Sequence, residues 1–165
     1  MEHSPIRWWQ RIIQRLASIE FISSGFLSKY LYRWDAAVLK WSNGEKSLTT
    51  MFTGLPVVVL TTTGAKSGKP RITPLAGFPD GENIILVASS LGNTHHPGWY
   101  YNLRANPEVQ LKINGQSSNY VAQVVDRPER EGYWQLALSY YPGYHAYEQR
   151  CGGREIPIVL LEPVT

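Results

Sequence analysis

The apolar positions of this chain follow two different periods, and the change falls between residues 43 and 56. From Ile6 to Trp41 apolar residues recur every three or four positions with one break, which predicts two helices that end at Asn43–Gly44. From Pro56 onward the apolar residues come in short runs that are rich in Val, Ile and Thr. Such runs are typical of β-strands. We therefore expect an N-terminal helical extension over residues 1–42 and a strand-rich unit over residues 43–165.

Six strands and two helices are expected in the second unit. The first strand, Pro56–Thr63, is almost wholly apolar, as in a strand buried on both faces. Asp80–Gly81 and Asn114–Gly115 are typical of hairpin turns. Hairpin-linked strands with few helices between them favour an antiparallel sheet or a small barrel. The remaining strands are expected at residues 71–78, 83–89, 109–114, 118–125 and 156–162, and the helices at 99–105 and 128–140.

Composition and charge narrow the range of functions. The 165 residues, 43% hydrophobic and 18% charged, suit one globular domain of ordinary size. Sixteen Lys and Arg against 13 Asp and Glu give a net charge of +3, which is too small to indicate a nucleic-acid-binding protein. Residues 1–40 hold six basic and three acidic groups, which accounts for the whole excess of positive charge. A basic amphipathic helix there either packs on its own domain or contacts an anionic membrane surface.

Several common kinds of site are not indicated. The single cysteine, Cys151, cannot form an internal disulfide, which indicates a reducing compartment, the cytoplasm. His95 and His96 are adjacent and have no second ligand pair at metal spacing, so no metal site is expected. No apolar run approaches the roughly 18–20 residues of a membrane span. The usual hydrolase and dinucleotide-binding motifs are also missing, which favours a bound reactive cofactor over acid–base chemistry by side chains.

The first segment with candidate chemistry is Thr61–Pro74. A strand ends in three threonines, and two glycines then bracket a lysine and a serine. Glycines let backbone N–H groups turn toward an anion, and Lys66, Lys69 and Arg71 add positive charge in a stretch (47–79) that has no acid. The order differs from that of a phosphate-binding P-loop, and a strand rather than a helix follows. The alternatives are an anion site and a solvated hairpin turn, and the charges favour the anion site.

The second segment is Val87–Pro107, in which a strand leads into small residues and then into a helix that begins near Pro97. Free N–H groups at a helix start bind a carbonyl or an anion. The small residues at 88–93 would let a flat ring lie against the backbone. We therefore expect this segment to hold the ring of a ligand.

The third segment is Tyr140–Tyr147. Tyr141, Tyr144 and Tyr147 stand three residues apart, so a helix would place them on one face. Burying three phenols requires hydrogen-bond partners. The three tyrosines therefore either belong to a core with such partners or line a half-open pocket for an aromatic ligand.

These segments occur in the order found in one known family. The shared motifs are TTTGxKSGxPRxTPL from Thr61 to Leu75, VAS from Val87 to Ser89, HPxWYxNL from His96 to Leu103, YPxYxxY from Tyr141 to Tyr147, and RxIPIV from Arg154 to Val159. Over about residues 30–165 the chain resembles the deazaflavin-dependent nitroreductase family. The resemblance implies an α+β fold, an antiparallel split β-barrel of the FMN-binding type, with coenzyme F420 as cofactor. It also implies hydride transfer from the reduced deazaflavin to a quinone-like, nitroaromatic or other conjugated acceptor.

The resemblance further implies roles for individual residues. Ser89 would hydrogen-bond near the developing charge, and Tyr144 would orient the acceptor or donate a proton. The phosphate and acidic tail of the cofactor would be held by Thr63, Gly64, Lys66, Ser67, Arg71, Thr73 and Pro74. The deazaflavin head would be held by Ala88, Ser89 and the backbone of Gly98, Trp99 and Tyr100. The substrate side would be formed by Ala76, Tyr141, Tyr144 and Tyr147.

Three places depart from the family pattern. Position 65 is Ala where Arg is usual, and positions 90 and 91 are Ser and Leu where Lys-Gly is common. The loss of two cations predicts a weaker hold on an anionic tail. Ala76 replaces a tyrosine of the nitroimidazole-activating member. Two alternatives stay open: the same barrel with FMN, which has one phosphate and no acidic tail, or a non-catalytic protein that binds a cofactor or a membrane surface.

Overall fold

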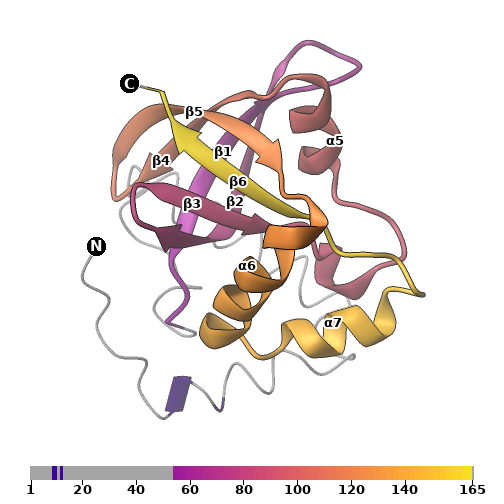
Figure 1. Cartoon of the computed structure of the whole chain (residues 1–165). Coiled ribbons are helices and arrows are strands. Elements are labelled where there is room, and N and C mark those ends of the chain that lie inside the picture. Colours follow the sequence, from indigo (N-terminus) through magenta and orange to yellow (C-terminus); the bar gives the residue numbers. More distant parts are fainter. Residues whose placement is uncertain (1–8, 11, 13–53, 165) are drawn as a thin grey trace.

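The structure, a computed structural model, describes residues 9, 10, 12 and 54–164 (Figure 1). Residues 9, 10 and 12 are helical. The rest of the expected extension over residues 1–42 lies outside the described residues, and so does the expected boundary at residue 43, so both stay predictions. In the described part of the chain, no helix is long and apolar enough to cross a membrane.

Six antiparallel strands form a closed barrel in the order β1–β2–β3–β6–β5–β4, in which β4 pairs back onto β1. The strands are β1 (Val57–Thr63), β2 (Pro70–Asp80), β3 (Asn83–Val87), β4 (Glu108–Ile113), β5 (Gln116–Val124) and β6 (Ile158–Pro163). Asn114 and Gly115 both have positive φ, 49° and 82°, as the two-residue turn between β4 and β5 requires. The expected α+β split β-barrel is confirmed.

Three helices and one short 3-10 helix connect the strands. They are η1 (Ser90–Gly92), α5 (Gly98–Ala105), α6 (Arg127–Tyr140) and α7 (Tyr144–Arg150). α5 and α6 begin within one residue of the expected positions. Figure 1 shows α5 beside the tip of the β1–β2 hairpin, whereas α6 and α7 lie together below the barrel. The helices therefore define two separate regions next to the barrel.

The barrel wall separates two hydrophobic cores. Because side chains alternate along a strand, Ile84 and Leu86 of β3 point into the barrel, while Ile85 and Val87 point outward beneath α6 and α7. β6 is likewise buried on both faces. The same expectation for the first strand is wrong, because only alternate residues of β1 are buried. The reason is that α6 packs on the outer faces of β2, β3 and β6.

Candidate functional site

The loop between β1 and β2 (residues 64–69) closes on itself. The Gly64 N–H donates to the Lys69 carbonyl at 2.9 Å, and the Gly68 N–H donates to the Gly64 carbonyl at 2.8 Å. Gly68 has a φ of +65°, which glycine adopts at little steric cost. Three cations are exposed here and form no ion pair with a described residue: Lys66, Lys69 and Arg71. Unneutralised cations on a closed loop suit a ligand with several negative charges.

Asn102 of α5 connects this loop (residues 64–69, which we call the basic loop) to the barrel through hydrogen bonds. Its Nδ2 donates to Thr62 Oγ1 at 3.0 Å, and its Oδ1 accepts from the Ala65 N–H at 3.1 Å. The Thr62 hydroxyl, in a residue that is 2% exposed, donates in turn to the Arg71 carbonyl at 3.5 Å. One side-chain amide thus holds both the loop and the start of β2. Sequence reasoning assigned no role to Asn102, although it stands within the HPxWYxNL motif.

We expect Asn102→Ala to loosen the basic loop and leave the barrel folded. The change removes one partner each from the Ala65 N–H and the buried Thr62 hydroxyl, a loss of about 1–3 kcal/mol. Amide hydrogen exchange should become faster at residues 64–69 and stay slow in β3 and β6. Asn106→Ala is the matched control, because Asn106 Nδ2 makes a single 3.4 Å contact with the Thr63 carbonyl. Unchanged exchange at Ala65 in Asn102→Ala would contradict this role.

Ala88 and Ser89 follow β3 directly, in irregular backbone and not in the strand expected to reach residue 89. Ala88 is fully buried, and its N–H donates to the Pro157 carbonyl at 2.9 Å. Ser89 is 8% exposed, and within the described part of the chain its hydroxyl makes no hydrogen bond. Because nearly buried polar groups are normally paired, this hydroxyl is suited to a ligand.

The start of α5 leaves two backbone donors open. Among the described residues, the N–H groups of Gly98 and Trp99 have no acceptor, whereas the Tyr100 N–H donates to the Pro97 carbonyl at 3.1 Å. The expected backbone role of Tyr100 stays a prediction, although its N–H already has this one acceptor, and its side chain packs against the barrel core. Among the residues that the structure describes, no other heavy atom lies within 4 Å of the place where a Gly98 side chain would project. A ligand can therefore reach this helix start.

Arg154, in the segment between α7 and β6, joins Ala88–Ser89 to the start of α5. Its Nη2 donates to the Ser89 carbonyl at 2.8 Å and its Nη1 to the Ala88 carbonyl at 3.3 Å. Nη1 also lies 2.9 Å from His96 Nδ1. Arg154 stands within the RxIPIV motif, but the sequence predicted no role for it. The residues in contact are 58 to 66 positions apart in the sequence, so no local sequence pattern predicts these contacts.

The backbone after Ser89 is unusual at three successive residues. Ser90 and Leu91 have φ values of 52° and 55°, and Gly92 has a φ of +80°. A non-glycine residue in this conformation costs about 1–2 kcal/mol, and position 91 is one where the resembled family commonly has Gly. A Cβ at Gly92 would lie 3.1 Å from Tyr147 Cα, so η1 packs closely on α7. Such strain occurs preferentially at binding sites.

The three tyrosines come together, but in a closed core. Tyr141, Tyr144 and Tyr147 are each 5–6% exposed. The hydroxyls of Tyr141 and Tyr147 are 3.1 Å apart and hydrogen-bonded, and the Tyr144 ring lies 5.2 Å from that of Tyr141. Ala76 packs against the same core. Of the two alternatives for these phenols, the described residues therefore favour the core with partners over the half-open pocket.

Burial makes all three phenols weaker acids. It raises the pKa of Tyr144, and the neighbouring Tyr147 raises it further. Burial also raises the pKa of Tyr141 and of Tyr147. All three are therefore neutral at physiological pH and act as hydrogen-bond donors, not as bases. Within the part of the chain that the structure describes, the Tyr144 hydroxyl makes no hydrogen bond.

α5 connects the two candidate binding features. Its Gly98 end is open, and Asn102 holds the basic loop four residues further on, about 6 Å along the helix axis. No group of three or more His, Cys, Asp or Glu gathers among the described residues in a way that would hold a metal. A split barrel with an open helix start beside a cationic loop is suited to a flat ring that carries an anionic tail. The fold and the site thus define a cofactor-binding split-barrel protein.

Comparisons with known proteins identify the family. The model of the F420H(2)-dependent quinone reductase family matches residues 31–163. The F420H(2)-dependent quinone reductase Rv1261c of Mycobacterium tuberculosis (strain ATCC 25618 / H37Rv) is 35% identical over 108 residues, which are 64% of this chain and 72% of the relative. The chain belongs to the F420H(2)-dependent quinone reductase family.

Two solved structures share this barrel. An F420-H2 dependent reductase (FDR-A) is 39% identical, with a TM-score of 0.60 over 65% of this chain and 94% of its own. A chain described as a domain-swapped dimer is 33% identical, with a TM-score of 0.63 over 82% of this chain and 98% of its own. Both likenesses extend over nearly the whole of the solved chains.

Proposed function

We propose that this protein oxidises reduced coenzyme F420 and reduces a quinone. Membership of the F420H(2)-dependent quinone reductase family supports this reaction. The observation that carries the proposal is that one helix, α5, has an open start and also holds the basic loop through Asn102. A deazaflavin with a phosphate and an acidic tail requires both features, one for the ring and one for the negative charges.

The residues present fit this cofactor. The open space at Gly98 and the Ser89 hydroxyl, which has no partner among the described residues, suit a polar ring edge. Lys66 and Arg71 are exposed and have no acid beside them among the described residues, which suits an anionic tail. We assign the ring to Ala88, Ser89, Gly98 and Trp99, which together we call the seat. We assign the phosphate and tail to Thr63, Gly64, Lys66, Ser67, Arg71, Thr73 and Pro74.

When bound, reduced F420 supplies a hydride from C5 of its ring. The chain itself would contribute position and hydrogen bonds, since holding two flat rings in contact lowers the barrier to transfer. The Ser89 hydroxyl would hydrogen-bond to the ring edge where charge develops. The neutral Tyr144 phenol would orient the acceptor through a hydrogen bond or donate a proton to it, and burial, which raises its pKa and so makes it a weaker acid, favours the orienting role.

The acceptor side is assigned to Ala76 and the tyrosine cluster, which pack together beneath α6 and α7. Because the tyrosines are nearly buried, an acceptor would have to lie at the edge of this cluster and not among the rings. We propose quinones as the principal acceptors and nitroaromatic compounds as further ones. Contact of residues 6–41 with a membrane surface, where lipid-soluble quinones reside, is proposed from the sequence pattern alone.

Anaerobic oxidation of F420H2, followed by absorbance against a panel of quinones, nitroaromatics and enones, tests this function. We expect turnover with quinones. Tyr144→Phe keeps the ring and removes the hydroxyl, so it should lower kcat with little change in the Kd for F420. Tyr101→Phe, an exposed tyrosine on α5, is the matched control and should retain wild-type kcat. If no acceptor in the panel is reduced, the proposed reaction is wrong and the protein has only a binding role.

A further inference from the structure

Arg154 hydrogen-bonds to two segments that carry the seat, the residues after β3 and the residues before α5. Its guanidinium donates to the carbonyls of Ala88, Ser89 and Asn93, at 3.3, 2.8 and 3.1 Å, and lies 2.9 Å from His96 Nδ1. Ala88 and Ser89 follow β3, while His96 precedes α5 by two residues. These two segments are not paired with each other as strands. The guanidinium is planar and carries five N–H donors, so it can hydrogen-bond to both of them.

Arg154 is itself held at the end of α7. Its N–H donates to the Cys151 carbonyl at 3.3 Å, and the Cys151 N–H donates to the Tyr147 carbonyl at 3.1 Å. The Cys151 thiol, in a residue that is 1% exposed, donates toward the Arg154 carbonyl at 2.9 Å. The guanidinium is thereby anchored to the helix that carries two of the three tyrosines, Tyr144 and Tyr147.

We propose that Arg154 is a positioning residue that fixes the distance between Ser89 and the start of α5, and so shapes the seat for the cofactor ring. The inference rests on the proposed function. Arg154 acts through the Ser89 and Ala88 carbonyls on one side and through the His96 ring on the other. Its role is geometric, because a single charge at the same place would not hold three carbonyls and one ring nitrogen together.

The state of His96 reports on this contact independently of any cofactor. A guanidinium only donates, so Nδ1 accepts and the neutral ring carries its proton on Nε2. Burial, and then the charges of Arg154 and Arg104, lower the pKa of His96. His96 also borders a cavity of about 310 Å³, whose charged lining residues are Asp126, Arg127, Arg130 and Glu155. Glu155 pairs with Arg127 and Arg130, at 3.5 and 3.3 Å, which partly neutralises those cations.

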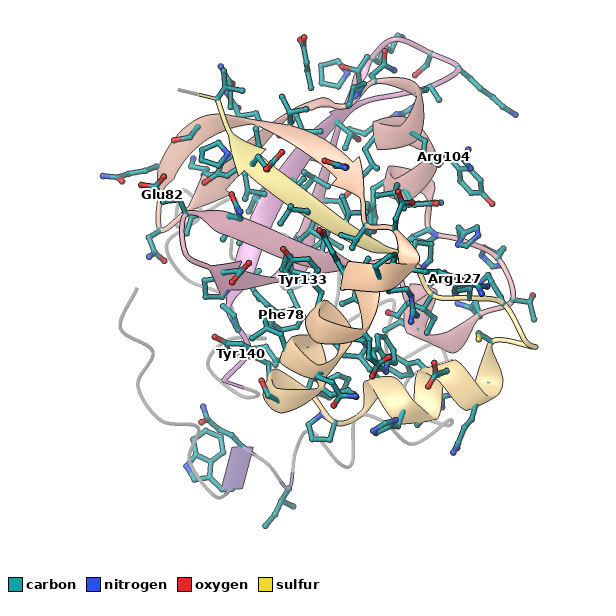
Figure 2. The ribbon with its side chains drawn as sticks, in the orientation of Figure 1. Phe78, Glu82, Arg104, Arg127, Tyr133 and Tyr140 are labelled. Atoms are coloured by element: carbon teal, nitrogen blue, oxygen red, sulfur yellow. The ribbon has the colours of Figure 1, made fainter. Side chains whose placement is uncertain are left out.

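Two variants of Arg154 separate geometry from charge. Arg154→Gln removes the charge and most of the donors, whereas Arg154→Lys keeps the charge but has no planar fork. Arg127→Gln is the matched control, since it removes one cation from the same cavity and Arg127 has an 88% exposed side chain. Figure 2 shows Arg127 among the side chains near the start of α6.

The experiment has two readouts on the full chain. In the first, NMR titration of the histidine rings without cofactor, with His96 assigned through His96→Gln, should give a higher His96 pKa in Arg154→Gln. The pKa should stay near the wild-type value in Arg154→Lys and in Arg127→Gln. In the second, fluorescence titration with F420 should show at least a tenfold rise in Kd for both Arg154 variants and less than a twofold rise for Arg127→Gln.

The outcomes are distinguishable. Failure of the wild-type chain to bind F420 overturns the proposed function, and the role of Arg154 falls with it. Binding by the wild type with an unchanged Kd in Arg154→Gln overturns the role of Arg154 alone. Restored affinity in Arg154→Lys shows that charge is what matters, and it also overturns the positioning role. If Arg154→Gln does not fold, the folded Arg154→Lys variant decides the question by its Kd.

Discussion

The double variant Lys66→Ala, Arg71→Ala is expected to raise the Kd for F420 by about thirtyfold at low salt. Each exposed cation that meets a ligand charge contributes up to about 1 kcal/mol, and about 1.4 kcal/mol is tenfold in affinity. Both side chains are exposed and, in the described part of the chain, have no acid to pair with, so their charge is available to the tail of the cofactor.

Salt dependence makes this prediction specific. Exposed charge pairs are screened by salt, so the wild-type Kd should rise steeply with ionic strength and that of the variant much less. Fluorescence titration at several salt concentrations measures both values. The matched control is Lys112→Ala, Arg127→Ala, which removes two cations from β4 and α6 and should keep the wild-type Kd and salt slope. A parallel titration with FMN tests the alternative cofactor, and tighter binding of FMN than of F420 would contradict our assignment.

Phe78→Ala is expected to cost about 3–5 kcal/mol of the free energy of unfolding. Phe78 lies on β2 with no exposed surface, and its ring stacks on Tyr140 at 5.0 Å and meets the edge of Tyr144 at 6.1 Å (Figure 2). Truncating a fully buried phenylalanine leaves a cavity, and the loss is a large share of a typical total of about 5–15 kcal/mol. Thermal unfolding followed by circular dichroism should show a fall in Tm of about 10 °C or more.

The Phe78→Ala variant should also distinguish the acceptor side of the site from the cofactor side. Because Phe78 supports the tyrosine cluster, kcat below the Tm should fall, whereas the Kd for F420, set by α5 and the basic loop, should change little. Ile72→Ala on the same strand is the control: Ile72 is 69% exposed, so the change should stay within about 0.5 kcal/mol. A loss of stability in Phe78→Ala no larger than that in Ile72→Ala would show that the outer core does not depend on this ring.

Much of the fold could be predicted from the sequence because its signals are local. Short runs rich in Val, Ile and Thr predicted each strand to within a few residues, and the Asn114–Gly115 pair predicted a turn whose two positive φ values were then found. The basic loop was visible as three cations in an acid-free stretch. The tyrosine spacing predicted that the three phenols would share one helix face, but only Tyr144 and Tyr147 lie on α7, and Tyr141 reaches them from the end of α6.

The extent to which each strand and tyrosine is buried could not be predicted from the local sequence. The sequence predicted burial on both faces for β1, yet β3 and β6 are the strands with both faces buried, because α6 packs over them. The tyrosines lie in a core, and not at a half-open wall, for the same reason. Which face of a strand is covered depends on where a helix far along the chain returns, and that is decided by how the barrel closes.

The sequence alone therefore determined the strands and their hairpin turns, the basic loop and the family motifs, each of which depends on neighbouring residues. Only the tertiary structure showed that Asn102 holds a loop 37 to 40 positions away and that Arg154 joins segments 58 to 66 positions away. The physical reason is that polar side chains form their hydrogen bonds with whatever groups barrel closure leaves unpaired beside them. Those partners come together only in the folded chain.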